Sequence, residues 1–248
     1  MREAGCEVVV RETPLPWQED WLIEQARDAA GLVFAMEPVS ARLLAQATAL
    51  KVIARPGVGF DTVDLEAATR RGVAVTIAAG TNDASVADFT LGLLLMATRG
   101  LLAGVQSVAA GGWSRTVGTE AWGKTLAVVG LGRIGQGVAR RARGFDMRVL
   151  AVTREPARHA AFAAANGVEL VDLDTALREA DFVSLHAPLT PQTANLVDGP
   201  ALAKMKRGAY LVNTARGGLV DEEALAAAVR SGHLGGAAVD VLRVQGEG

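Results

Sequence analysis

Arg216 stands where a buried segment would ordinarily avoid charge, and its position suggests chemistry. Residues 209–212 before it are apolar enough for an interior strand, and residues 221–229 after it follow a helical pattern. The carboxyl end of a parallel strand is where open α/β sheets bind ligands, and a planar guanidinium can hold a carboxylate through two parallel hydrogen bonds. The alternative is a structural arginine that caps the helix or pairs with Asp221.

A glycine-rich turn follows a predicted strand at 125–129 and precedes a predicted helix that runs through Arg143. The turn is Gly130-Leu131-Gly132-Arg133-Ile134-Gly135. The first glycine permits a tight turn, the second lets the backbone approach a pyrophosphate, and the third lets helix and strand pack closely. The helix amino end adds amide donors and a positive dipole. The alternative is an ordinary glycine-rich turn, but the strand–turn–helix context predicts a dinucleotide site.

The end of the next predicted strand, 148–152, bears on the choice of coenzyme. An acidic residue at this point accepts hydrogen bonds from the adenosine ribose of NAD(H). The chain has Thr153 and Arg154 instead, and a guanidinium there suits a ribose that carries a 2′-phosphate. Glu155 is the alternative, because a small loop shift would bring it to the acid's place and leave Arg154 in solvent. We favour NADP(H) over NAD(H) and assign Thr153 and Arg154 to the coenzyme site.

Short apolar runs alternate with helical patterns along the chain, which is typical of parallel sheets covered by helices. The runs form two sets, separated by an alanine- and leucine-rich stretch at 83–111 that we predict to be one long helix joining two α/β domains. Within it, Ser85 to Asp88 fits a capping box, so Asp88 is predicted to start a helix and not to be a catalytic carboxylate. The expected strands are 8–10, 31–34, 51–54, 73–76, 125–129, 148–152, 182–185, 209–212 and 237–241.

Composition narrows the classes of protein. The 248 residues, half of them hydrophobic and 21% charged, are enough for two domains with cores. A net charge of −2 favours neither nucleic acid nor a membrane surface as a partner. The single cysteine, Cys6, cannot form an internal disulfide, and no Cys/His spacing suggests a metal site. Without a visible signal stretch or membrane span, a cytoplasmic location is expected.

Four long blocks of the chain resemble the D-isomer-specific 2-hydroxyacid dehydrogenase family, which includes phosphoglycerate dehydrogenases and glyoxylate/hydroxypyruvate reductases. The resemblance implies a Rossmann-type doubly wound parallel sheet plus a smaller, incomplete flavodoxin-like substrate domain, with the active site in the cleft between them. It implies hydride transfer between NAD(P)(H) and a small 2-keto or D-2-hydroxy acid. The blocks are 51–75, 123–151, 180–193 and 202–241.

The same resemblance suggests residue roles. Arg216 matches the catalytic arginine that holds the substrate carboxylate and polarises the C2 carbonyl. Val58 and Gly59 match a loop whose backbone amides meet that carboxylate, although an ordinary tight turn before Asp61 is the alternative. The further coenzyme contacts that the resemblance implies are His186, Ala187, Pro188, Thr190, Thr214, Ala215, Arg216 and Asp240.

The chain departs from the family at the proton donor. The family uses a histidine paired with a glutamate, which holds the imidazole oriented and protonated. Gln245 is the nearest match to the glutamate, and the family's histidine comes later, in a Pro-His-x-Gly segment. His159 and His233 are expected away from the ligand edge, and His186 matches the coenzyme loop. We therefore expect coenzyme binding with slow turnover; the alternative is a non-catalytic dinucleotide-binding or oligomerising protein.

Residues 1–82 are expected to form the substrate domain, without the family's first strand–helix unit. Residues 83–248 are expected to form the linking helix and the NAD(P)-binding domain, without its last strand. Because the 83–111 helix is too apolar to be solvated, we expect a homodimer through it. Phe34 replaces a phosphate-binding arginine of phosphoglycerate-type members, which argues against that substrate.

Overall fold

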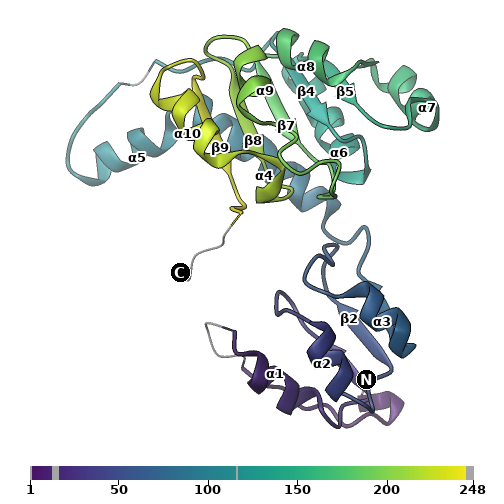
Figure 1. The fold of residues 1–248 in the computed structure, drawn as a ribbon. Coiled ribbons are helices and arrows are strands. Elements are labelled where there is room, and N and C mark those ends of the chain that lie inside the picture. Colours follow the sequence, from purple (N-terminus) through teal and green to yellow (C-terminus); the bar gives the residue numbers. More distant parts are fainter. Residues whose placement is uncertain (1, 13–16, 116, 244–248) are drawn as a thin grey trace. The chain divides into compact units, whose positions relative to one another are not determined.

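The computed structural model describes residues 2–12, 17–115 and 117–243, which divide into two compact units (Figure 1). The first unit runs to Asn82 and the second begins at Asp83. Each unit is built on a sheet whose strands are all parallel. The predicted α/β class with parallel sheets is therefore confirmed.

The second unit contains a six-stranded sheet in the order β6-β5-β4-β7-β8-β9. Numbered along the unit, this order is 3-2-1-4-5-6, the arrangement of the doubly wound dinucleotide-binding fold. The order reverses between β4 and β7, so their carboxyl ends border the crevice where such sheets bind ligands. The strands are β4 (Thr125–Val129), β5 (Arg148–Val152), β6 (Val168–Leu170), β7 (Phe182–Leu185), β8 (Tyr210–Asn213) and β9 (Gly236–Val239).

Helices cover both faces of this sheet (Figure 1): α4, α6 and α7 pack on one face, and α8, α9 and α10 on the other. Strand β4 contributes to both cores, because Leu126 and Val128 point to the first face while Ala127 and Val129 point to the second. The helices are α4 (Asp83–Arg99), α5 (Leu101–Ala109), α6 (Arg133–Ala142), α7 (Pro156–Asn166), α8 (Leu173–Glu179), α9 (Gly199–Lys204) and α10 (Glu222–Arg230), with 3₁₀ turns η2 (Arg143–Phe145) and η3 (Gly217–Leu219).

The first unit contains a smaller sheet in the order β1-β2-β3. Leu32, Ile53 and Val75 face a core formed with α1, α2 and α3. On the other face, Val33 and Val52 are 54% and 37% exposed, so among the described residues of this unit the helices cover one face of the sheet. The elements are η1 (Arg2–Ala4), α1 (Glu19–Ala26), β1 (Gly31–Val33), α2 (Ala41–Gln46), β2 (Val52–Arg55), α3 (Leu65–Arg71) and β3 (Ala74–Ile77).

One strand prediction is wrong, and one strand was not predicted. Residues 8–10 form no strand, and Val9 and Val10 are exposed. β-branched residues favour a strand only where a neighbouring strand pairs with them, and the sheet of this unit ends at β1. Strand β6 was not predicted, because its three residues include Glu169 and form no apolar run. The other strands lie within two residues of their predicted bounds, the usual scatter of strand ends.

The single helix predicted for 83–111 is also wrong. The chain breaks at Gly100, which has a φ of 61°, and α4 and α5 form an angle of 68°. Helix α4 begins before Ser85, so the capping box does not form, and Asp88 pairs with Arg141 of α6. Among the described residues no single helix is long and apolar enough to cross a membrane, and only the bent α4–α5 pair meets that criterion when both helices are counted together.

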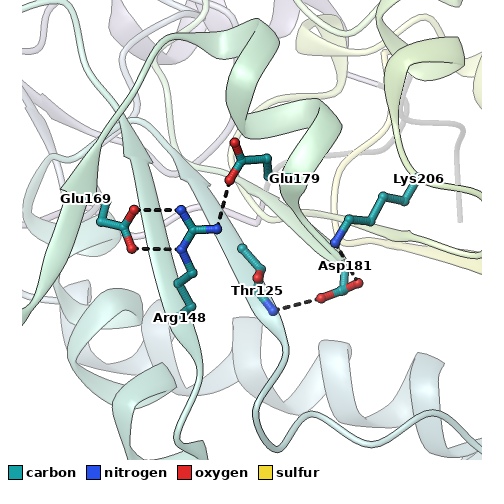
Figure 2. A network of polar contacts seen from close by, with 6 residues as sticks. All are labelled: Thr125, Arg148, Glu169, Glu179, Asp181 and Lys206. Atoms are coloured by element: carbon teal, nitrogen blue, oxygen red, sulfur yellow. Dashed lines mark hydrogen bonds and ion pairs between the residues drawn. The ribbon is translucent and has the colours of Figure 1, made fainter.

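Charged side chains join the amino ends of several strands (Figure 2). Arg148 of β5 donates two hydrogen bonds to Glu169 of β6 (2.7 and 2.6 Å) and one to Glu179 of α8 (2.8 Å). The guanidinium holds the pKa of Glu169 below its ordinary value. Asp181 accepts a hydrogen bond from the first backbone N–H of β4 (2.9 Å) and pairs with Lys206 (3.1 Å). This edge lies opposite the glycine-rich turn, so these contacts support the sheet and not the ligand edge.

Candidate coenzyme and substrate site

The three glycines of the turn after β4 differ in what a side chain would meet. Gly130 has a φ of 104°, and a Cβ there would lie 2.6 Å from backbone atoms of His186 and Ala187. A Cβ on Gly135 would collide with the Gly130 carbonyl oxygen, whereas one on Gly132 would meet nothing within 4 Å. Of the three glycines, only Gly132 therefore borders open space, of the kind that a pyrophosphate needs.

Helix α6 begins directly at this open position. Gly132 is its N-cap residue, no side chain in the described part of the chain caps it, and the first turn contains no acidic residue. Arg133, the first helical residue, is exposed, and Ile134 is half-buried. Uncapped amides and the positive end of the helix dipole bind anions. The residues present therefore fit the pyrophosphate of a dinucleotide.

A pocket of about 560 Å³ opens at the carboxyl ends of β5 and β6. Thr153 lines this pocket, and Arg154, the next residue in the sequence, is exposed. The carboxylate of Glu155 pairs with Arg158 (3.0 Å), whereas Arg154 makes no hydrogen bond or ion pair within the described residues. The pocket is lined by Thr153, Pro156, Leu170, Val171, Asp172 and Thr175.

His186 follows β7, at the same sheet edge as the glycine-rich turn. Its backbone N–H donates to the Val129 carbonyl (2.7 Å), and its Nε2 lies 2.8 Å from the Ser184 hydroxyl. Burial lowers the pKa of the His186 imidazole from 6.5 to about 4. The imidazole is therefore neutral at physiological pH and is a poor proton donor there.

The loop after His186 is held by Thr193, which the sequence analysis did not select. Its hydroxyl donates to the Pro188 carbonyl (2.6 Å) and accepts the Thr190 backbone N–H (2.7 Å). These two bonds fix the segment that contains Ala187, Pro188 and Thr190. The Thr-x-x-Thr spacing, which favours local side-chain-to-backbone bonds, is the signal that could have revealed it.

Arg216 lies in the loop between β8 and η3, and Asn213 shapes that loop. The buried Asn213 amide accepts the Ala215 backbone N–H (3.0 Å) and donates to the Arg216 carbonyl (2.9 Å). The Arg216 guanidinium donates to the Ala215 carbonyl (2.7 Å). Asp221 caps α10, because its carboxylate accepts the Ala224 N–H (3.0 Å). An asparagine at the end of an otherwise apolar predicted strand was the sequence signal that could have revealed Asn213, because an amide buried there needs hydrogen-bond partners.

The chain beyond β9 passes against the same loop. A Cβ on Gly217 would collide with the backbone of Leu242 and Arg243. Arg243 is anchored there, since its N–H donates to Glu222 (2.5 Å). The exposed Asp240 follows β9, and its N–H donates to the last carbonyl of β8 (3.0 Å). Position 217 thus requires a glycine, because two segments that are distant in sequence approach each other too closely there for a side chain.

In the first unit, Val58 and Gly59 form the turn after β2. Arg55, at the end of β2, donates to the carbonyls of Gly59 and Ala35, the latter at 2.6 Å. The amides of Val58 and Gly59 donate to no acceptor within the described ranges. Successive amides of this kind form an anion-binding hollow. Arg55 was missed by the sequence analysis, although a charged residue at a strand end was a usable signal.

The other histidines lie elsewhere. His233 comes before β9, with its Nε2 3.0 Å from the Leu202 carbonyl, at the amino edge of the sheet. His159 belongs to α7, with its Nδ1 3.4 Å from the Gln136 side chain. Gln245, the nearest match to the family's glutamate, lies outside the described residues. Thr153, Arg154, Thr214, Arg216, Asp240 and the loop after β7 all follow carboxyl ends of strands in the second unit, as the glycine-rich turn does.

The strand order, the glycine-rich turn and the uncapped α6 together define a dinucleotide-binding α/β unit. The family described as D-isomer specific 2-hydroxyacid dehydrogenase, NAD binding domain, matches residues 91–246. The chain belongs to the D-isomer specific 2-hydroxyacid dehydrogenase family.

Known proteins agree with this assignment. Over 243 residues the chain is 47% identical to the D-3-phosphoglycerate dehydrogenase of Mycobacterium leprae, covering 97% of this chain and 46% of that protein. It is 40% identical to the glyoxylate reductase of Thermofilum pendens, covering 98% and 74% respectively. The solved structure of the TT0316 protein from Thermus thermophilus matches with a TM-score of 0.90 and 43% identity, over 100% of this chain and 78% of that one. The chain spans about half the length of the phosphoglycerate dehydrogenases it matches.

The glycines allow packing and ligand binding to be tested separately. Gly132→Ala should fold with nearly unchanged stability, because Gly132 has a φ of −71° and free space, but its methyl group should weaken coenzyme binding about tenfold or more. Gly135→Ala should lower the free energy of unfolding by about 1–3 kcal/mol through overpacking. Denaturant unfolding and coenzyme titration measure the two effects. Equal coenzyme affinity in Gly132→Ala and the wild type would contradict the pyrophosphate assignment.

The low pKa of His186 predicts a loss of stability in acid. Between pH 6.5 and about 4 the unfolded chain binds a proton at this imidazole that the folded chain does not, so stability should fall as the pH falls through this window. His186→Asn should remove that part of the pH dependence in thermal melts. The imidazole NMR titration gives a direct check: a midpoint near the ordinary value of a histidine would refute the prediction.

Proposed function

We propose that the chain is an NAD(P)-dependent oxidoreductase acting on a small D-2-hydroxy acid or the corresponding 2-keto acid. The observation that supports this proposal is the edge of the six-stranded sheet at which its strands have their carboxyl ends. At this edge an open glycine-rich turn follows one strand, and an arginine-containing loop held by side-chain hydrogen bonds follows another strand of the same sheet. The matched relatives are named for D-3-phosphoglycerate and glyoxylate, both acids with oxygen at C2. Their names support the substrate class and not a choice within it.

The proposed roles follow from chemistry. A bound nicotinamide coenzyme would supply or accept the hydride. Arg216 would hold the substrate carboxylate through its planar fork and stabilise negative charge at the C2 oxygen. The amides of Val58 and Gly59 would bind a carboxylate oxygen. The residues proposed to hold the coenzyme are Gly130, Gly132, Arg133, Ile134, Gly135, Thr153, Arg154, His186, Ala187, Pro188, Thr190, Thr214, Ala215, Arg216 and Asp240.

Protonation of the C2 oxygen requires an acid, which typically contributes about 10²–10⁴-fold. His186 stands at the ligand edge, but its pKa of about 4 leaves it neutral. We therefore propose that the polypeptide of residues 1–248 binds coenzyme and turns over slowly. The same property of His186 favours the second candidate function, a dinucleotide-binding protein without catalysis.

Arg216→Lys tests the catalytic proposal, because lysine keeps the charge but loses the planar fork. We expect kcat/KM to fall about ten- to hundredfold, and coenzyme affinity to fall by a smaller factor, because Arg216 is only one of the residues proposed to hold the coenzyme. The assay is turnover of glyoxylate, hydroxypyruvate and D-3-phosphoglycerate with NADH and NADPH, and the exposed Arg207→Lys is the control. An unchanged kcat/KM would rule out the assigned role. Coenzyme binding without any turnover in the wild type would support the second candidate.

We further propose a preference for NADP(H). The carboxylate of Glu155 is engaged by Arg158, which leaves the exposed Arg154 as the charged group beside Thr153. Both members of the Glu155–Arg158 pair are largely exposed, so the pair supports this preference only modestly.

Arg154→Ala should weaken NADPH binding by about 1–3 kcal/mol and leave NADH binding nearly unchanged. Arg158→Ala is the matched control: it frees Glu155 and should leave NADPH affinity close to that of the wild type. Fluorescence titration with both coenzymes measures the effects. Equal losses for NADH and NADPH in Arg154→Ala would show that Arg154 does not read the 2′-phosphate, and tighter NADH binding in Arg158→Ala would favour Glu155 as the ribose ligand.

We also propose a homodimer formed through α5. This helix has no buried residue, and Leu101, Leu102, Val105 and Val108 are between 52% and 66% exposed along it. Leu101, Val105 and Val108 follow the i, i+4, i+7 spacing of one helical face. An exposed apolar face of this kind is typical of a protein interface.

Val105→Asp should convert the dimer to a monomer, because it places a charge in the centre of the apolar face. Gln106→Asp adds the same charge to the same helix at a polar position and should leave the dimer intact. Sedimentation equilibrium of the wild type and the two variants measures which of them form dimers. A wild-type monomer at high concentration would contradict the proposal.

A further inference from the structure

In the first unit, a carboxylate of the protein itself occupies the loop that follows β1. Oε2 of Glu37 accepts hydrogen bonds from the backbone N–H groups of Ala35 (2.8 Å) and Met36 (2.9 Å). Successive amides that converge on one oxygen form an anion-binding hollow. Glu37 is the one charged residue between Phe34 and Ser40, so this hollow is filled by a negative charge that belongs to the chain.

The loop after β2 lies beside the loop after β1, because Arg55 holds both of them. Its guanidinium donates to the carbonyl of Ala35 in the first loop (2.6 Å) and to the carbonyl of Gly59 in the second. Both loops follow the carboxyl ends of neighbouring parallel strands. A guanidinium is only a few ångströms wide, so the Glu37 carboxylate and the turn at Val58 and Gly59 are neighbours on this edge of the sheet.

The two loops differ in what they offer to an anion. The amides after β1 are engaged by Glu37, whereas those of Val58 and Gly59 donate to no acceptor within the described ranges. The exposed Asp61 adds a second carboxylate two residues after Gly59. Arg55, a cation at this edge, has a partner in the protein at each of its three nitrogens. A ligand with a second anionic group would therefore meet a carboxylate beside the turn.

We propose that Glu37 is a specificity-determining residue that restricts the substrate to 2-keto and D-2-hydroxy acids with one anionic group, and that it excludes their phosphate esters. The inference rests on the proposed function, in which the amides of Val58 and Gly59 bind the substrate carboxylate. A phosphate ester has between about 1.5 and 2 negative charges at neutral pH. Its repulsion by a nearby carboxylate is a cost that an uncharged hydroxyl group does not meet.

Isothermal titration with D-glycerate and with D-3-phosphoglycerate, in the presence of saturating NADH or NADPH, tests the proposal. The two acids differ only in the phosphate group, and no turnover occurs because acid and coenzyme are both reduced. The wild type should bind D-glycerate more tightly. Glu37→Gln keeps an oxygen that can accept from the two amides but loses the charge, so the preference for D-glycerate should shrink about tenfold.

Glu66→Gln is the matched control. It removes the same charge from the same unit, at the first turn of α3, where the largely exposed Glu66 pairs with Arg70. This variant should keep the wild-type preference.

An unchanged preference in Glu37→Gln would overturn the inference and leave the proposed function intact. The same holds for a wild type that binds D-3-phosphoglycerate more tightly than D-glycerate, which keeps the inference testable if Glu37→Gln does not fold. A folded wild type that binds the coenzyme but neither acid would contradict the proposed substrate class, and the inference with it.

Discussion

The contact between Gly135 and the Gly130 carbonyl is the constraint on which the ligand edge depends. No side chain fits there, so the start of α6 packs directly on the turn that leaves β4. Gly130 in turn lies against the backbone of His186 and Ala187, at the point where the strand order reverses. The turn, the helix amino end and the loop after β7 are therefore held together by backbone packing, and only Gly132 is left facing open space.

Neutral side chains organise the loops of this edge. Asn213 fixes the backbone around Arg216, Thr193 fixes the loop after His186, and Thr90 orients the hydroxyl of Thr214. Each of the three is buried and bonds to backbone or to another hydroxyl, so their geometry depends little on salt or pH. The amino edge differs, because exposed ion pairs centred on Arg148 join its strands.

The features of the second unit that suit an anion are local and do not come from the overall charge. The chain has a net charge of −2, but the uncapped amides at α6 offer N–H donors, with Arg133, Arg154 and Arg216 near strand and helix ends. His186 adds no charge, because burial holds it neutral. Such a site attracts phosphate and carboxylate groups at defined positions while the surface as a whole does not.

The sequence by itself determined the glycine-rich turn, most strands and the position of Arg216 at a strand end, because local spacing and periodicity encode these features. The absent strand at 8–10, the short β6 and the bend at Gly100 depended on pairing and packing that local propensity does not contain. Tertiary structure alone decided that Gly217 lies under the chain beyond β9 and that Thr90 bonds Thr214. Both contacts join segments distant in sequence, and a hydrogen bond or a close approach between such segments exists only once the sheet and its covering helix have come together.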